Sequence, residues 1–369
     1  YFKGTKEKLF NNIKKLEEMD VIFVCLPTPL NSDKSPDMSY LNSFFKKIKF
    51  FKKKYQTIIL ESTVYPGASQ DIIKKHNLKK KLKKKELYFV YSPERENPGM
   101  KNFSYKTTPK VVSGYNKDSL IIGINIYKKF VNRVVETSSL SNAEATKLLE
   151  NLFRSVNIGL INEFKIICEK LNLNIYEIIK SASTKNFGFM KFLPGPGLGG
   201  HCIPIDPYYL NWASRKKGYT AQFIKTSGDI NSKMPMRIVN KISNVLKKKK
   251  SKKSNLKILL VGIAYKKNID DDRETPGYEI IYQLQKRKYK VNYYDPYIPK
   301  IKSGRKFKDK IKLKSIKISQ KNLRNHDAIL IVTDHDKINY NYILKNSNLI
   351  FDSRGVYKDH YDNEKIFSV

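Results

Sequence analysis

One short segment of the sequence combines a thiol, a carboxylate and an unusual density of glycine. Residues 195–207 read Gly-Pro-Gly-Leu-Gly-Gly-His-Cys-Ile-Pro-Ile-Asp-Pro, so that Asp206 follows Cys202 by four positions. Glycines such as Gly197 and Gly199 let a ligand or a second backbone approach closely, because they carry no side chain. A cysteine thiolate is intrinsically a strong nucleophile. The segment predicts a nucleophilic cysteine on a substrate loop; a tight structural turn around a buried cysteine is the alternative.

Polar residues also follow three apolar runs that are typical of buried strands, at 21–26, 57–60 and 87–91. Ligands of doubly wound α/β folds bind at the carboxyl ends of such strands. The candidates at these ends are Thr28, Thr63, Glu94 and Glu96. We expect them to lie along one edge of the first sheet.

Two further groups of candidates lie later in the chain. Lys147 and Asn151 are spaced i and i+4 in a helical pattern that runs from residue 142 to about residue 171, so they share one helix face. Three motifs of the second α/β region contain cations, namely Lys266, Arg273 and Arg354.

The order of predicted elements indicates an α/β protein. Strand patterns alternate with lysine-rich amphipathic stretches up to about residue 135, which predicts a domain with a parallel sheet. Helical patterns dominate residues 136–240, and a second alternation of strands and helices covers residues 255–369. The lysine run at 247–250 predicts an exposed connection between these last two regions.

The first domain lacks the usual opening of a dinucleotide-binding fold. Such a fold begins with a strand, a G-x-G-x-x-G turn and a helix, but only Gly4 precedes the run at 21–26. Either the first βαβ unit is missing from this sequence, or the domain does not bind a dinucleotide.

Composition excludes several classes of protein. The formal net charge is +38, but the lysines are spread over the whole length, so we expect no nucleic-acid partner and only a weak preference for anionic ligands. No apolar run approaches the roughly 18 residues of a membrane span, and the start has no signal-peptide pattern, which predicts a cytoplasmic protein without a membrane partner. The cysteines lack metal-ligand spacing, and we expect no metal site. Four histidines are expected to be surface or packing residues: His76, His326, His335 and His360.

Taken in order along the chain, these motifs resemble those of the nucleotide-sugar 6-dehydrogenases, the UDP-glucose and GDP-mannose dehydrogenase family. The stretch Phe-Gly-Phe-Met at 187–190 and the segment from 199 to 209 are most similar to the bacterial UDP-N-acetylglucosamine 6-dehydrogenases. The resemblance covers essentially the whole chain. It implies a truncated Rossmann-like NAD-binding domain at 1–135 without its first βαβ unit, a helical central domain at 136–240 that forms a homodimer, and a Rossmann-like UDP-sugar-binding domain at 255–369.

The resemblance also implies an activity. The C6 alcohol of UDP-N-acetylglucosamine would be oxidised to the uronate by two NAD⁺, in surface polysaccharide biosynthesis. Cys202 would form a thiohemiacetal and then a thioester, with Lys147 stabilising negative charge on oxygen and Glu94 activating the hydrolytic water. Asp206 would orient a water or the lysine ammonium, and Asn151 shares the helix face of Lys147.

By the same resemblance, the remaining candidates divide between cofactor and substrate. Those for the nicotinamide half of NAD are Thr28, Thr63, Glu96 and Arg273. Those for the UDP-sugar are Gly197, Gly199, Lys266 and Arg354.

Three alternatives stay open. UDP-N-acetylmannosamine or UDP-glucose could be the substrate, because C2 epimers differ in only a few contacts, although Ile205, where the glucose branch has lysine, favours an N-acetylhexosamine. The chain could instead be a non-catalytic remnant without a cofactor site, or a basic nucleic-acid module.

Overall fold

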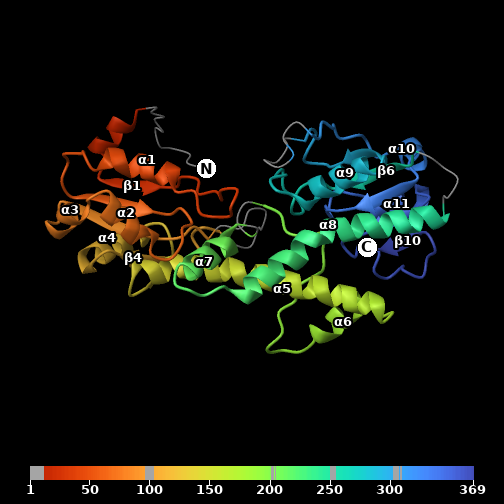
Figure 1. Cartoon of the computed structure of the whole chain (residues 1–369), viewed down its shortest axis with the longest axis horizontal. Helices are drawn as coiled ribbons and strands as arrows, with labels where there is room; N and C mark the ends of the chain where they lie inside the picture. The colour runs from red at the N-terminus through yellow and green to blue at the C-terminus, as the bar shows by residue number, and fades with distance from the viewer. Residues whose placement is uncertain are drawn as a thin grey trace. The chain divides into compact units, whose positions relative to one another are not determined.

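The computed structural model describes residues 12–95, 104–200, 203, 205–249, 255–301, 307 and 310–369. The chain divides into two compact units. The first comprises Tyr1–Glu150 with Ile205–Thr220, and the second comprises Asn151–Pro204 with Ala221–Val369. Each unit contains a five-stranded sheet with helices packed against it (Figure 1).

The sheet of the first unit has its strands in sequence order, β1-β2-β3-β4-β5. The strands are β1 (Val21–Val24), β2 (Gln56–Leu60), β3 (Leu87–Tyr91), β4 (Lys110–Gly114) and β5 (Val134–Glu136). The predicted parallel pairing is confirmed for β1 to β3 and is wrong for β3 and β4, which are antiparallel. A parallel pair needs a crossover element, and the described part of the connection from β3 to β4 contains no helix.

Alternate side chains of these strands build a core on each face of the sheet. Ile58 and Leu60 pack toward helices α1 (Ser39–Ile48), α2 (Ala68–Lys75) and α3 (Lys79–Lys83). Ile59 packs on the opposite face with α4 (Lys117–Tyr127). Burial on both faces explains why residues 58–60 of β2 are consecutive apolar residues. The short 3₁₀ helix η1 (Ile13–Glu18) and helix α7 (Asp206–Arg215) also belong to this unit.

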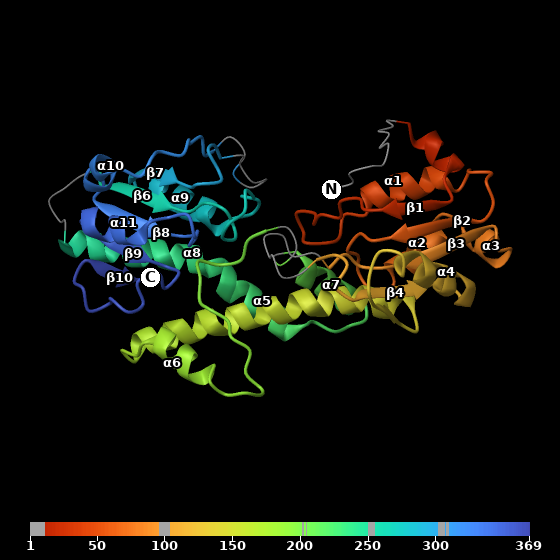
Figure 2. The same ribbon diagram turned by 180° about the vertical axis from the view of Figure 1, so that it is seen from behind.

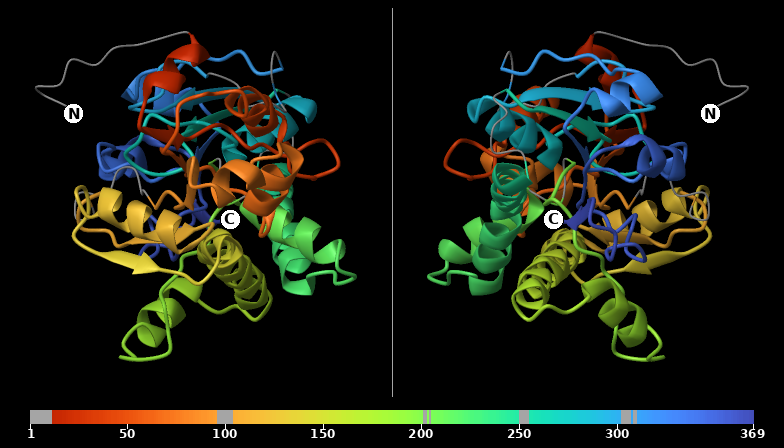
Figure 3. Two further views of the ribbon diagram at one scale, coloured as in Figure 1. Left: turned by 90° about the vertical axis from the view of Figure 1, so that its left-hand side faces the viewer. Right: turned by 90° about the vertical axis from the view of Figure 1, so that its right-hand side faces the viewer.

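Besides α7, two long helices and one short one lie in the described part of the region predicted to be helical. They are α5 (Leu140–Lys170), α6 (Ile175–Ala182) and α8 (Gln222–Lys249). The predicted long helix is confirmed by α5, which Figure 3 views nearly along its axis. The prediction of an exposed connection at 247–250 is wrong for residues 247–249, which form the last turn of α8 with exposed side chains. Leu246 is fully buried and continues the apolar face of α8, so packing extends the helix through the charged run.

The sheet of the second unit is entirely parallel, with the order β10-β9-β8-β6-β7. Its strands are β6 (Lys257–Val261), β7 (Lys290–Tyr294), β8 (Ala328–Ile331), β9 (Ile350–Asp352) and β10 (Ile366–Ser368). Helices α8 and α9 (Pro276–Lys286) pack on one face, and α10 (Gln320–Arg324) and α11 (Tyr340–Asn346) on the other (Figure 2). The strand order reverses between β6 and β8, and ligands of such sheets bind at the carboxyl end of that switch point.

None of the helices within the described part of the chain combines the length and the apolar character that a bilayer-spanning helix requires.

Candidate functional site

In the first unit, the loops that follow β1 and β2 are joined by hydrogen bonds. The Thr28 hydroxyl donates to the carbonyl of Thr63 at 2.7 Å, and the Ser62 hydroxyl donates to the carbonyl of Leu26 at 2.8 Å. Both loops leave the carboxyl ends of adjacent parallel strands. Two of the predicted cofactor residues therefore lie side by side at the edge where the sequence predicts them.

Helix α5 and the turn after β3 bring Lys147 to Glu94. The Lys147 ammonium donates to the main-chain oxygen of Glu94 at 2.6 Å and lies 3.6 Å from its carboxylate Oε2. Arg95 anchors the same turn, because its Nε donates to Glu150 of α5 at 3.0 Å and its Nη1 donates to the carbonyl of Pro109 at 2.8 Å. Lys147 is only 6% exposed. The structure thus joins two residues that the sequence separates by 53 positions.

Helix α7 adds a buried carboxylate to this unit. Asp206 is the first residue of α7 and is buried. One turn later, the hydroxyl of the fully buried Tyr209 donates to the carbonyl of Thr28, which fixes α7 against the predicted cofactor loop. Cys202, predicted as the nucleophile, and Glu96, predicted at the nicotinamide, lie outside the described residues.

Sequence reasoning missed Glu144, a fully buried carboxylate on α5. It accepts hydrogen bonds from the main-chain N–H groups of Gly67 at 2.6 Å and Ser69 at 2.9 Å, and so caps the start of α2. Burial raises the pKa of Glu144 to about 7, although these hydrogen bonds favour the ionised form. The residue orders the loop that begins at Thr63, and its lone position in a helical pattern gave no local signal of that role.

In the second unit, two buried asparagines hold the start of the glycine-rich loop. The side-chain oxygen of Asn162 on α5 accepts the main-chain N–H of Gly195 at 2.9 Å. Its amide nitrogen donates to Asn231 of α8 at 2.9 Å, and Asn231 donates in turn to the carbonyl of Ser155 at 3.1 Å. Neither asparagine was predicted as a site residue. Asparagines on the buried faces of two long helices are the signal that could have identified them, because buried polar groups need hydrogen-bond partners.

The glycines of this loop are needed for close packing. A Cβ at Gly199 would lie 2.7 Å from Cβ of Tyr265, and one at Gly200 would lie 2.9 Å from the Tyr265 ring. Gly197 has φ of +128°, which side chains rarely adopt, and a Cβ there would lie 3.0 Å from the carbonyl of Asn231. The segment 195–200 can therefore follow its path only without side chains at these positions.

Arg354, predicted at the UDP-sugar, and Arg273, predicted at the nicotinamide, both contact this loop within the second unit. A Cβ at Gly195 would lie 2.6 Å from Nη1 of Arg354, whose Nε donates to Asp334 at 2.8 Å. The main-chain N–H of Gly200 donates to the carbonyl of Arg273 at 3.0 Å. Lys266 lies in the loop after β6; burial, followed by the charge of Arg154, lowers its pKa. Arg273 and Arg354 thus lie against the loop that contains Gly197 and Gly199.

Asn151 lies one helical turn beyond Lys147 on α5 and is buried. The i,i+4 spacing predicted from the sequence is therefore realised on a continuous helix, with both side chains on one face.

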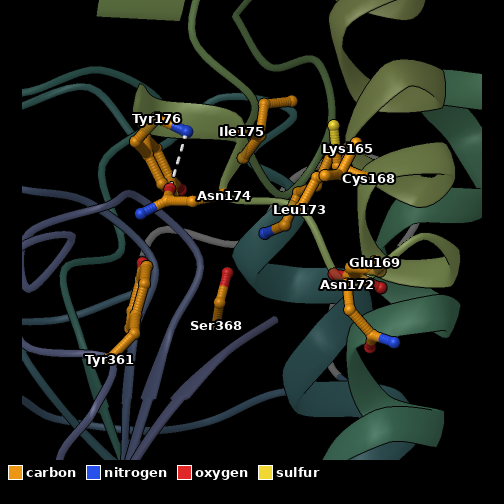
Figure 4. Close-up of a pocket in the computed structure, with 10 residues that line it drawn as sticks. All are labelled: Lys165, Cys168, Glu169, Asn172, Leu173, Asn174, Ile175, Tyr176, Tyr361 and Ser368. Carbon is orange, nitrogen blue, oxygen red and sulfur yellow. Dashed lines mark hydrogen bonds between the residues drawn. The ribbon is translucent and has the colours of Figure 1, made fainter. Parts of the chain in front are cut away.

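A separate pocket of about 230 Å³ opens in the second unit, where the end of α5 and the start of α6 meet the segment of β10 (Figure 4). Asn174 lines it and accepts the main-chain N–H of Tyr176 at 3.0 Å (Figure 4). Lys165 also lines it, with a fully buried side chain whose ammonium donates to the main-chain oxygen of Val369. Burial lowers the pKa of Lys165 to about 8. The residues that line this pocket include none of the predicted site residues.

Comparisons with known proteins match both units. Profiles of the UDP-glucose/GDP-mannose dehydrogenase family match the chain with the NAD binding domain at residues 4–131, the central domain at 141–233 and the UDP binding domain at 259–359. The chain is 34% identical over 311 residues to UDP-N-acetyl-D-mannosamine dehydrogenase of Methanocaldococcus jannaschii, covering 80% of this chain and 69% of that protein. It is 33% identical over 293 residues to UDP-N-acetyl-D-glucosamine 6-dehydrogenase of Pseudomonas aeruginosa, covering 78% and 68%. The solved structure of a UDP-D-ManNAc dehydrogenase from Pyrococcus horikoshii matches with a TM-score of 0.82 at 29% identity, over 94% of this chain and 80% of that chain.

A doubly wound α/β fold with an NAD-binding domain, a helical central domain and a UDP-binding domain defines an NAD-dependent nucleotide-sugar dehydrogenase that acts on a CH–OH group. The chain belongs to the UDP-glucose/GDP-mannose dehydrogenase family. The sequence-based predictions of family, fold class, enzyme class and NAD as cofactor are confirmed. The individual roles of the site residues stay predictions.

Proposed function

We propose that this enzyme oxidises the C6 alcohol of a UDP-N-acetylhexosamine to the carboxylate, in two successive hydride transfers followed by hydrolysis. The proposed substrate is UDP-N-acetylglucosamine, and the product is an acidic sugar nucleotide for surface polysaccharide. UDP-N-acetylmannosamine is the second candidate, because the relative from Methanocaldococcus jannaschii bears that name.

The observation that most supports the proposal is the contact between Lys147 and the Glu94 turn. A buried ammonium held 2.6 Å from a main-chain oxygen is fixed in position before substrate binds. Such a preorganised charge stabilises an oxyanion more effectively than a mobile one, because it needs no reorganisation during the reaction. We assign Lys147 to the oxygen on C6, with Asn151 as a neutral hydrogen-bonding partner on the same helix face.

Cys202 is the proposed nucleophile. Its thiolate would add to C6 of the aldehyde formed in the first oxidation, giving a thiohemiacetal, and loss of the second hydride would leave a thioester on sulfur. Water activated by Glu94 would add to the thioester carbon and release the carboxylate and the free thiol. Asp206 is assigned to orient that water. NAD⁺, when bound, supplies the hydride acceptor for each oxidation.

The described residues of the first unit fit the nicotinamide half of NAD. The loops after β1 and β2 present hydroxyl and main-chain groups, including Thr28 and Thr63, which are held in place by hydrogen bonds. Neutral donors and acceptors of this kind suit a carboxamide and a ribose. We assign these two threonines to that role, with Glu96 and Arg273 as further contacts.

The substrate side is assigned to the second unit. Lys266 and Arg354 are proposed to pair with the diphosphate, which a guanidinium can bind in bidentate fashion. Gly197 and Gly199 are proposed to let the sugar approach the backbone of the loop.

The test is to incubate the enzyme with NAD⁺ and each UDP-sugar in turn and to count NADH per sugar consumed. Two NADH per sugar, with UDP-N-acetylglucosamine as the best substrate, is the expected result. Cys202→Ser should abolish acid formation while UDP-sugar binding persists. Full turnover by Cys202→Ser, or one NADH per sugar, would refute the covalent route.

We also propose a homodimer formed through α5. Phe153, Leu160 and Ile167 repeat every seven residues along this helix and are 48%, 57% and 45% exposed. Exposed apolar residues in a heptad pattern are typical of a helix that packs against a partner. Leu160→Glu should convert the dimer to a monomer in light-scattering measurements. A wild-type monomer at micromolar concentration would contradict the proposal.

A further inference from the structure

In the second unit, a buried carboxylate at the end of β7 binds the loop that follows β6. Asp295 Oδ2 accepts the main-chain N–H groups of Ile263 at 2.7 Å and Ala264 at 3.0 Å, while Oδ1 accepts that of Tyr297 at 2.8 Å. Burial alone would raise the pKa of Asp295, but the hydrogen bonds from His335 and from the main-chain N–H groups outweigh burial and lower it. The ionised carboxylate therefore fixes the start of the loop.

A fully buried histidine after β8 completes this arrangement. His335 Nε2 lies 3.0 Å from Oδ2 of Asp295, and His335 Nδ1 accepts the main-chain N–H of Asn268 at 2.9 Å. The second contact makes Nδ1 an acceptor, so the proton that bridges to Asp295 resides on Nε2. Thr333 adds a hydroxyl hydrogen bond to the carbonyl of Ala264 at 2.5 Å. Residues 263–268 are thus bound at both ends by the strands on either side of β6.

This loop in turn contacts the glycines that precede the cysteine. The Tyr265 side chain packs against Gly199 and Gly200, leaving no space for a Cβ at either position. The Gly200 N–H is bound to the carbonyl of Arg273 further along the same connection. Cys202 follows two residues later in the sequence. Any shift of the loop at 263–268 would therefore be transmitted to the segment that leads to the thiol.

We propose that Asp295 and His335 are positioning residues that fix the loop bearing Lys266 and, through Tyr265, the backbone that leads to Cys202. The inference rests on the proposed function in assigning UDP to Lys266 and chemistry to Cys202. It adds that one buried carboxylate–imidazole pair fixes two parts of the chain. One is the loop that carries Lys266 at the proposed diphosphate site, and the other is the backbone that precedes Cys202.

The test compares His335→Ala with His326→Ala in the 369-residue chain. His326 is the matched control: it is also buried and hydrogen-bonded, to Asn292 at 3.0 Å, but it lies before the amino end of β8, at the opposite edge of the sheet. Two readouts are measured alongside thermal stability. One is the Kd for UDP, and the other is the rate at which iodoacetamide alkylates Cys202, followed by peptide mass spectrometry. Cys25 in the first unit, an exposed thiol, is the internal reference for alkylation.

For His335→Ala, we expect the Kd for UDP to rise about tenfold and Cys202 to react at least about threefold faster relative to Cys25, because small displacements of a preorganised site have large effects. His326→Ala should change neither readout by more than about twofold, even where its loss of thermal stability is equal. Asp295→Asn, which keeps the side-chain size and removes the charge, should change both readouts in the same direction by a smaller factor. It serves as the test variant if His335→Ala does not fold.

Two results would overturn the inference. One is that His335→Ala and His326→Ala have equal effects on the two readouts. The other is that the ratio of Cys202 to Cys25 alkylation stays unchanged in both His335→Ala and Asp295→Asn. Failure of the wild-type chain to bind UDP would instead count against the proposed function. The alkylation ratio would still decide whether the pair positions the segment before Cys202, because that readout does not depend on UDP.

Discussion

The two units position their candidate residues by different means. In the first unit, two cationic side chains hold one turn: Lys147 donates to the main-chain oxygen of Glu94 and lies 3.6 Å from its carboxylate, and Arg95 donates to Glu150. In the second unit, buried polar groups bind the backbone, as Asn162 does at Gly195 and Asp295 does at Ile263.

The difference matches what each unit is proposed to do. A single charged group accepts or donates a proton, or stabilises an oxyanion, so its side chain must be placed accurately. A diphosphate and a sugar offer many oxygens at once, so the backbone of the loops that carry Lys266, Arg354 and the glycines must be placed accurately. Substitutions that remove a charge should therefore affect catalysis most in the first unit, and substitutions that add volume should affect the second unit most.

The largest expected effect is on catalysis in the first unit. Lys147→Ala should lower kcat about 1000-fold with little change in the KM for the UDP-sugar, because one preorganised charge at a developing oxyanion contributes that much. NADH formation under saturating substrate measures it. Lys170→Ala, at the exposed end of the same helix, is the control and should retain full activity. If Lys147→Ala instead raised KM and left kcat unchanged, Lys147 would be a substrate-binding residue, and the contrast between the units would be weaker.

The next effect tests backbone placement in the second unit. Gly262 and Gly218 have nearly the same φ, +83° and +82°, but a Cβ at Gly262 would collide with Thr333, whereas a Cβ at Gly218 would meet nothing within 4 Å. Gly218→Ala should cost about 1 to 2 kcal/mol from backbone strain alone. Gly262→Ala should cost about 2 kcal/mol more from the collision. Urea denaturation measures the free energy of unfolding of both variants. Equal losses of this free energy would show that the loop after β6 shifts to accommodate the added methyl group at little cost.

A third effect concerns the buried carboxylate of the first unit. Burial raises the pKa of Glu144 from 4.5 to about 7, so the folded state binds this proton more tightly than the unfolded state. Stability contributed by the protonated form is complete below pH 4.5 and is lost as the pH rises through 7. Relative to Glu144→Gln, the wild type should lose about 3 kcal/mol between pH 5 and pH 8. Glu177→Gln, an exposed control on α6, should show no such trend. Parallel pH profiles for wild type and Glu144→Gln would disprove the assignment.

The smallest effect has the opposite sign and lies in the second unit. Burial lowers the pKa of Lys165 from 10.5 to about 8, so the unfolded state binds this proton more tightly. Wild-type stability should therefore rise with pH from 8 toward 10.5, and by about 2 kcal/mol between pH 8 and pH 10 relative to Lys165→Met. Denaturant titrations of both proteins at these two pH values provide the measurement. A wild type that loses stability over this range would contradict the direction.

Sequence reasoning predicted most of the elements and the edge of each sheet that bears the candidate residues. Thr28 and Thr63 were placed together because they follow adjacent apolar runs, and the structure joins them by a hydrogen bond. It failed at the pairing of β3 with β4, where periodicity gives no strand direction. It also failed at residues 247–249, where charge suggested a loop and packing of Leu246 extends a helix.

The sequence by itself determined the family, because the order of short motifs along the chain is specific even though each motif alone is not. It also determined which residue types are present for the chemistry, from the thiol of Cys202 to the guanidinium of Arg354. Only the tertiary structure decided what holds them. The Asn162–Asn231 pair, the cap that Glu144 provides at Gly67 and the His335–Asp295 pair join residues 69, 77 and 40 positions apart. Contacts of that range leave no periodicity in the sequence, because they depend on how separate elements pack against one another and not on the local path of the chain.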